Sequence, residues 1–170
     1  TAANILKILE MPDGTTTVIV QGKQSFQLTS IQKKKKKGYL TGIISPRKSN
    51  SKYEKNPTKN FKALISAIKD LAMRIIRLSG NVQQEVLFAL KNIEGNGYIV
   101  NFVSANVGLE KDERQSILEI EDLEERASEL LKKLSTMSQM LEIKSSIQSQ
   151  AMENIDKQQR EYFLQQQIKT

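Results

Sequence analysis

Five consecutive lysines form the densest group of charged side chains in the sequence: Lys33, Lys34, Lys35, Lys36 and Lys37. Ammonium groups at this density attract phosphate backbones and other anionic partners, because each neutralised phosphate releases a counterion. No aromatic side chain alternates with the lysines to stack on bases, and Tyr39 and Tyr53 flank the run only loosely. A solvated loop, held open by like-charge repulsion, explains the run more simply. Nucleic-acid binding through this loop is therefore the alternative hypothesis and not the leading one.

The net charge of the chain comes from this region and not from the whole protein. The 170 residues contain 26 Lys and Arg against 19 Asp and Glu, a formal net charge of +7. Residues 1–60 contain twelve basic and three acidic side chains, a net of +9, whereas residues 61–170 contain fourteen and sixteen, a net of −2. The basic character is thus local and does not identify the chain as a nucleic-acid-binding protein.

Apolar side chains in the last third of the chain are the second set of candidate contacts: Met137, Met140, Tyr162 and Phe163. Methionine adapts to variable apolar partners, and an aromatic pair on a polar helix is typical of a contact surface. For the two methionines, packing in a core or helix seam is the favoured interpretation, and a contact role is the second one. All four residues are kept as candidate substrate or partner contacts.

Several kinds of catalytic site are excluded by composition. The chain has no Cys and no His, so it lacks the residues for a zinc finger, a Cys-His pair, a Ser-His-Asp triad or a redox dithiol. It has no phosphate-binding loop of the type GxxxxGK[ST] and no GxGxxG turn. The acidic residues between 110 and 125 suit the positive ends of helix dipoles better than a metal or acid/base site. We expect no catalytic residue, cofactor site or metal site in this chain.

The residues before 46 have the pattern of β-strands. Residues 4–20 predict a hairpin, because a β-branched segment follows the turn Pro12-Asp13-Gly14-Thr15. Residues 25–28 and 39–44 predict two further strands on either side of the lysine run. Four strands without helices expose their edges, and so we expect other structure to cover them.

From Thr58 the apolar residues recur at helical spacing. Thr58 is suited to cap a helix that ends at residues 79–81, and shorter helices are predicted over residues 82–93 and 98–107. The last of these is apolar on nearly every side and is expected at the centre of a bundle. Asp112 is then expected to cap a short helix that extends to Ile120.

A long helix is predicted from Asp122 onwards, because Asp122 and Glu125 have capping-box spacing and no Gly or Pro follows Gly108. Six apolar residues alternate four- and three-residue steps in its first part: Leu123, Ala127, Leu130, Leu134, Met137 and Leu141. An unbroken helix over residues 122–170 would be about 70 Å long, and it would project beyond its own domain. Its seam is expected to pair with other copies or a following domain, or else to lie across the preceding bundle.

The predicted organisation has four parts. Residues 1–45 form a partial β lobe, residues 46–57 a basic polar linker, residues 58–121 a helical bundle, and residues 122–170 a long neck helix whose first half packs on the bundle. The fold class is α+β. The sequence lacks an initiator Met and stops within a helical pattern, so we expect it to be part of a longer protein. No run of about 18 apolar residues is present, and we expect no membrane partner.

Three of these segments resemble the N-terminal region of the Lon family of ATP-dependent proteases. Residues 156–169 (DKQQREYFLQQQIK) look like the helix that leads into the family's ATPase module. The turn at residues 12–15, with Val18, Val20 and Gly22, looks like the family's hairpin. Residues 71–79 and 101–103 look like its helical lobe.

The resemblance implies a partial PUA-like β lobe, a helical bundle and a projecting neck helix. It further implies a non-catalytic region that recognises unfolded, damaged or degron-bearing proteins and supports assembly of a homohexamer. ATP, Mg and a Ser-Lys dyad are expected only in the parent protein, an ATP-dependent serine endopeptidase of the bacterial cytoplasm or, as the second choice, the mitochondrial matrix. A structural coiled-coil adaptor without substrate affinity is a further alternative.

Overall fold

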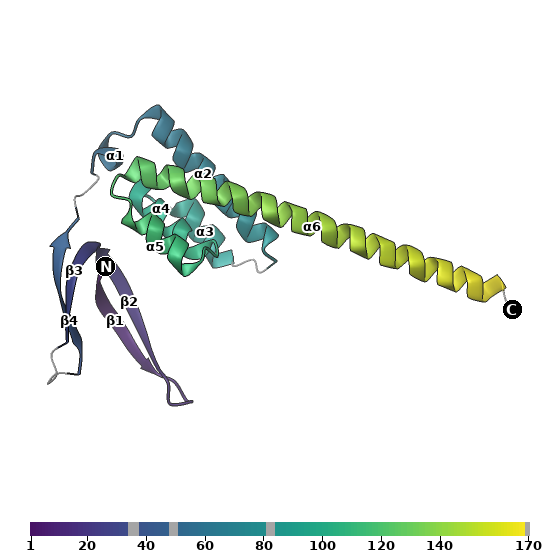
Figure 1. Ribbon diagram of the computed structural model, residues 1–170, viewed down its shortest axis with the longest axis horizontal. Coiled ribbons are helices and arrows are strands. Elements are labelled where there is room, and N and C mark those ends of the chain that lie inside the picture. The colour runs from purple at the N-terminus through teal and green to yellow at the C-terminus, as the bar shows by residue number, and fades with distance from the viewer. Residues whose placement is uncertain (34–37, 48–50, 81–83, 169–170) are drawn as a thin grey trace. The chain divides into compact units, whose positions relative to one another are not determined.

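The computed structural model describes residues 1–33, 38–47, 51–80 and 84–168. Two compact units follow one another along the chain, Thr1–Ser49 and Asn50–Thr170. The first contains the strands and the second contains the helices (Figure 1). An α+β fold class is therefore confirmed.

The first hairpin pairs strands β1 (Ala2–Glu10) and β2 (Thr16–Gln24) in antiparallel fashion. Asp13 organises the turn, because one of its carboxylate oxygens accepts hydrogen bonds from the Thr15 hydroxyl (2.6 Å) and the Thr15 amide (2.9 Å). These bonds favour the charged carboxylate and lower the pKa of Asp13, the hydroxyl bond contributing most. Gly14 has a φ of 81°, which glycine adopts without strain. The predicted hairpin and turn are thus present.

Strands β3 (Phe26–Lys33) and β4 (Leu40–Pro46) form a second antiparallel pair. Each strand extends beyond the segment predicted for it, and only Ser25 separates β2 from β3. The described strands form two separate two-stranded sheets. Large apolar side chains of both sheets are exposed, namely Ile5, Leu6, Ile8, Val18, Ile19, Val20, Leu28, Ile31, Leu40, Ile43 and Ile44. The strands of this unit therefore lack a shared core.

Six helices make up the described part of the second unit: α1 (Ser51–Lys55), α2 (Lys59–Leu78), α3 (Gln84–Asn92), α4 (Asn96–Asn106), α5 (Lys111–Glu119) and α6 (Leu123–Ile168). α4 contacts each of the other five, as expected for a central helix, although Tyr98 on its outer side is exposed. α6 lies along α2 and then continues away from the bundle (Figure 1). At 46 residues, α6 is about 70 Å long.

The boundaries of α2 follow from its end residues. The Thr58 hydroxyl accepts a hydrogen bond from the Phe61 amide (3.1 Å), as predicted for an N-cap. At the other end the Ser79 amide donates to the Ile75 carbonyl, and Gly80 follows with a φ of 76°. The start of α5 differs from expectation by two residues, because Glu110 and not Asp112 occupies its N-cap position.

The helical core lies where α2, α4 and the first half of α6 meet. Phe61, Ile68, Ala72, Val100, Ala127, Leu130 and Leu134 are all completely buried there. The apolar seam predicted for α6 therefore faces its own bundle, and Met137 and Leu141 pack at the edge of the same core. Burial of this seam is what holds the long helix to the unit.

The segment predicted as a linker, residues 46–57, differs from that prediction because it contains α1. Tyr53 of α1 is only 7% exposed, its ring centroid lies 4.8 Å from that of Phe61, and its hydroxyl donates to Asp122 (3.0 Å). The Glu54 carboxylate accepts from the amides of Asn96 (2.9 Å) and Gly97 (2.6 Å) at the start of α4. The surrounding residues are basic and polar and do not indicate these contacts, because the partners are distant in the chain.

Candidate functional site

The second half of α6 presents an uncovered apolar stripe. Every side chain from residue 143 to residue 167 is exposed. Six exposed apolar residues between positions 140 and 162 are spaced by three, four or seven, which places them on one side of a helix with 3.6 residues per turn. We name this set the distal stripe: Met140, Ile143, Ile147, Ala151, Ile155 and Tyr162.

The four apolar candidates from the sequence fall in different environments. Met137 is half-buried against the bundle core, whereas Met140 is 65% exposed at the start of the distal stripe. Tyr162 and Phe163 are both exposed, and their rings meet edge to face with centroids 6.5 Å apart. Tyr162 belongs to the distal stripe, and Phe163, the next residue along the helix, projects beside it. The structure thus brings Met140 and Tyr162 onto one face and leaves Met137 as a packing residue.

The lysine candidates cannot be placed in the same way. Lys33 is the last residue of β3, and Lys34, Lys35, Lys36 and Lys37 lie outside the described residues. The anionic-partner hypothesis therefore gains no geometric support.

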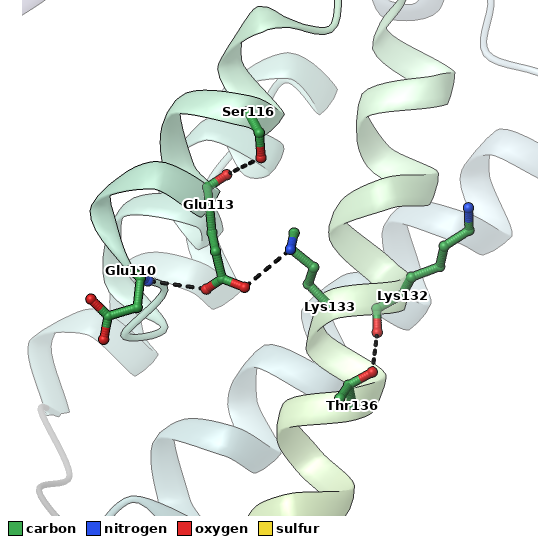
Figure 2. A network of polar contacts seen from close by, with 6 residues as sticks. All are labelled: Glu110, Glu113, Ser116, Lys132, Lys133 and Thr136. Carbon is green, nitrogen blue, oxygen red and sulfur yellow. Dashed lines mark hydrogen bonds and ion pairs between the residues drawn. The ribbon is translucent and has the colours of Figure 1, made fainter.

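A network of polar contacts joins α5 to the first half of α6 (Figure 2). The Lys133 ammonium lies 3.0 Å from Oε1 of Glu113, and Oε2 of Glu113 accepts from the Glu110 amide (3.1 Å). Ser116 donates its hydroxyl to the Glu113 carbonyl (2.8 Å). The hydrogen bond from Lys133, followed by that from Glu110, lowers the pKa of Glu113. This acidic residue therefore has a structural role, as expected from its place in the first turn of α5.

Replacing Glu113 with Gln is expected to lower the free energy of unfolding by at most about 1 kcal/mol at pH 7, because both partners are partly exposed to solvent. The folded-state pKa lies below the ordinary value of 4.5, so the contact stabilises the fold above that pH. Its contribution is lost as the pH falls through the lowered pKa. Urea unfolding of both proteins between pH 7 and about pH 3 measures this difference.

The matched control is Glu129→Gln, which removes an exposed contact with Lys132 within α6. It should cost no more than about 0.5 kcal/mol. A Glu113→Gln difference that persists at the acidic end would contradict the assigned role of Glu113.

A second candidate lies on the bundle, in a groove between α2 and α3 that the sequence did not predict. It has a volume of about 390 Å³ and is lined by Arg77, Gln84, Leu87, Phe88 and Lys91. We name it the α2–α3 groove. Phe88 is 72% exposed, and its neighbours on the same face of α3 are polar. A lone aromatic residue among polar side chains was the signal available in the sequence.

The described residues contain no cluster of three or more acidic side chains placed to hold a metal ion. Likewise, no helix within the described ranges is long and apolar enough to cross a membrane.

Residues 1–136 match the family model described as the ATP-dependent protease La (LON) substrate-binding domain. The chain belongs to this family. The match spans both units and ends within α6, before the last two seam residues, Met137 and Leu141, and before the distal stripe.

Two bacterial relatives extend the similarity of this Lon domain through the rest of α6. The chain is 42% identical to the Lon protease of Flavobacterium johnsoniae over 170 residues, which is 100% of this chain and 20% of the relative. It is 43% identical to the Lon protease of Parabacteroides distasonis over 168 residues, or 99% of this chain and 20% of the relative. The chain thus spans about a fifth of the length of these relatives.

A solved structure shares the fold of the Lon domain. The N-terminal domain of a Mycobacterium avium complex Lon protease superimposes with a TM-score of 0.62, covering 78% of this chain and 67% of that one. Sequence identity is 19%, so this likeness concerns the fold alone. The comparisons confirm the family predicted from the sequence and its assignment as a substrate-binding domain, and they do not support the nucleic-acid alternative.

Proposed function

We propose that this Lon domain recognises unfolded or degron-bearing proteins for a larger ATP-dependent serine protease. The observation that carries the proposal is the distal stripe, an apolar surface on a helix that the family's substrate-binding domain anchors. Exposed apolar stripes are typical of interaction surfaces, because burying apolar surface stabilises a complex by about 25 cal/mol per Å². Unfolded proteins offer the apolar segments that such a surface binds.

Catalysis in this proposal belongs to other parts of the parent protein. The chain has no phosphate-binding loop, and the residues that the structure describes include no group of three or more acidic side chains placed to hold a metal ion. The ATPase and the Ser-Lys dyad implied by the family would therefore lie outside these 170 residues. No catalytic role is assigned to any residue here.

Several copies of the chain would act together in the parent protein. A homohexamer, as the family implies, would bring several distal stripes near one substrate and raise the effective concentration of weak apolar contacts. Met140, Tyr162 and Phe163 are the proposed substrate contacts on each copy, whereas Met137 supports the helix from the bundle side. The bacterial relatives favour the cytoplasm as the compartment.

Binding of a permanently unfolded protein, such as a casein, tests the proposal directly. With the chain immobilised at high density, the triple variant Ile143→Ser/Ile147→Ser/Ile155→Ser is expected to bind at least about tenfold more weakly, because each buried Ile contributes about 1.5–3 kcal/mol. Surface plasmon resonance measures the affinity, and circular dichroism checks that helicity is retained.

The matched control is Gln148→Ser/Gln150→Ser/Gln159→Ser, which places the same three serines elsewhere on the same exposed segment. It should bind the casein as well as the unmodified chain does. Equal loss in both variants, or no binding by the unmodified chain, would refute the proposed function.

A further inference from the structure

The α2–α3 groove combines an apolar floor with two cations. Its volume of about 390 Å³ lies within the range of about 300–1,000 Å³ that is typical of ligand pockets. Four of its lining residues come from α3 at positions i, i+3, i+4 and i+7, which form one face of a helix: Gln84, Leu87, Phe88 and Lys91. Arg77 contributes the opposite wall from the last turn of α2.

The apolar part of the groove is anchored on one side and open on the other. Leu87 is buried, and Leu90, three residues further along α3, packs in the core. The backbone of α3 is therefore held in place. Phe88 has the largest exposed fraction, 72%, of the exposed large apolar residues in the described ranges. A protruding ring on a held helix offers apolar area to a partner at little cost in ordering.

The charged part of the groove has one sign. Arg77 and Lys91 line it, and no carboxylate does. Neither cation forms a hydrogen bond or an ion pair with another side chain in the described part of the bundle. Residues 61–170 as a whole have a net charge of −2, so this positive site is local.

We infer that the α2–α3 groove binds unfolded segments in which acidic residues flank an apolar side chain. The apolar side chain covers Phe88 and Leu87, and the flanking carboxylates pair with Arg77 and Lys91. This inference rests on the proposed function and adds a preference that the uncharged distal stripe does not supply. Basic segments are rejected, because they would leave the two cations facing like charges.

Short fluorescent peptides test this preference on the full chain. The probe has Asp and Glu around two Phe residues, and two counterparts replace either the acids with Lys or the Phe residues with Ser. The unmodified chain is expected to bind the probe at least about tenfold more tightly than either counterpart. Fluorescence anisotropy at low and high salt measures the affinities, and the acidic probe should weaken as salt rises.

Two groove variants and two matched controls locate the binding. Arg77→Glu/Lys91→Glu should bind the probe at least about tenfold more weakly, whereas Lys59→Glu/Lys62→Glu makes the same charge change at exposed sites of α2 and should not. Phe88→Ala should also weaken binding, whereas Tyr98→Ala, which removes another exposed aromatic side chain (62%) from α4, should not. Circular dichroism confirms that all four variants retain the helices.

The outcomes separate this inference from the proposed function. Loss of probe binding in both groove variants, with casein binding retained, supports the groove. Casein binding without probe binding, or equal weakening in groove and control variants, overturns the inference and leaves the proposed function intact. Failure of both ligands overturns both. A DNA oligonucleotide that displaces the probe and is insensitive to Phe88→Ala would make the groove a polyanion site and also overturn the inference.

Discussion

Replacing Leu130 with Ala is expected to lower the free energy of unfolding of the helical unit by about 2–5 kcal/mol. Leu130 is completely buried on the face of α6 that packs against the bundle. Removing three carbons there loses the transfer free energy of the side chain and leaves a cavity that the surrounding helices fill only in part. Urea unfolding followed by the helical circular dichroism signal measures the change, because the first described unit contributes strands and no helix.

Leu164→Ala is the matched control, since it makes the same substitution on the same helix at a side chain that is 59% exposed. Its effect should stay within about 0.5 kcal/mol. Similar losses in the two variants would mean that the first half of α6 is not anchored as described.

Replacing Tyr53 with Ala is expected to destabilise the same unit by about 3 kcal/mol. The substitution removes a buried ring that packs against Phe61 and a hydroxyl that donates to Asp122. Asp122 also accepts from the amides of Glu124 (3.0 Å) and Glu125 (3.1 Å), so its carboxylate caps α6 while it holds α1. Loss of the tyrosine therefore affects both α1 and the start of α6.

Tyr53→Phe keeps the ring and should cost only about 1 kcal/mol, the typical net value of one hydrogen bond. Tyr98→Ala serves as the exposed control and should change the free energy of unfolding little, because Tyr98 is 62% exposed. If Tyr53→Ala were as mild as this control, residues 51–55 would behave as the linker that the sequence suggested.

Local signals in the sequence were sufficient for the elements that are fixed by their own end residues. The turn at Asp13 and Gly14, the Thr58 cap and the unbroken course of α6 from Asp122 all depend on residues within a few positions of one another. The spacing of the apolar residues likewise identified which face of α6 is apolar and packs against other structure. It could not decide what covers that face, because a seam that pairs between molecules and one that packs on its own bundle have the same period.

Features that depend on distant partners were not predictable. Tyr53 lies in a basic, Ser- and Asn-rich stretch, and its burial depends on Asp122, which is 69 positions away. The α2–α3 groove depends on how two helices are turned about their axes, and single-sequence periodicity does not fix that rotation. The division of the methionine pair has the same origin, since Met137 is on the covered side of α6 and Met140 is not.

Because α6 is one continuous helix, the helical structure of its second half depends on the stability of the bundle that holds its first half. Starting a helix costs more free energy than lengthening one. In α6 (Leu123–Ile168) the first turns are stabilised by packing in the bundle core, which includes Leu123 and Ala127. The last printed contact with the bundle is the ion pair of Glu142 with Arg74 of α2 (2.9 Å), and every side chain from residue 143 to residue 167 is exposed, so each further turn there needs only propagation. Amide hydrogen exchange should therefore quicken steadily with distance from the bundle, and loosening the bundle should quicken it along the whole distal stripe.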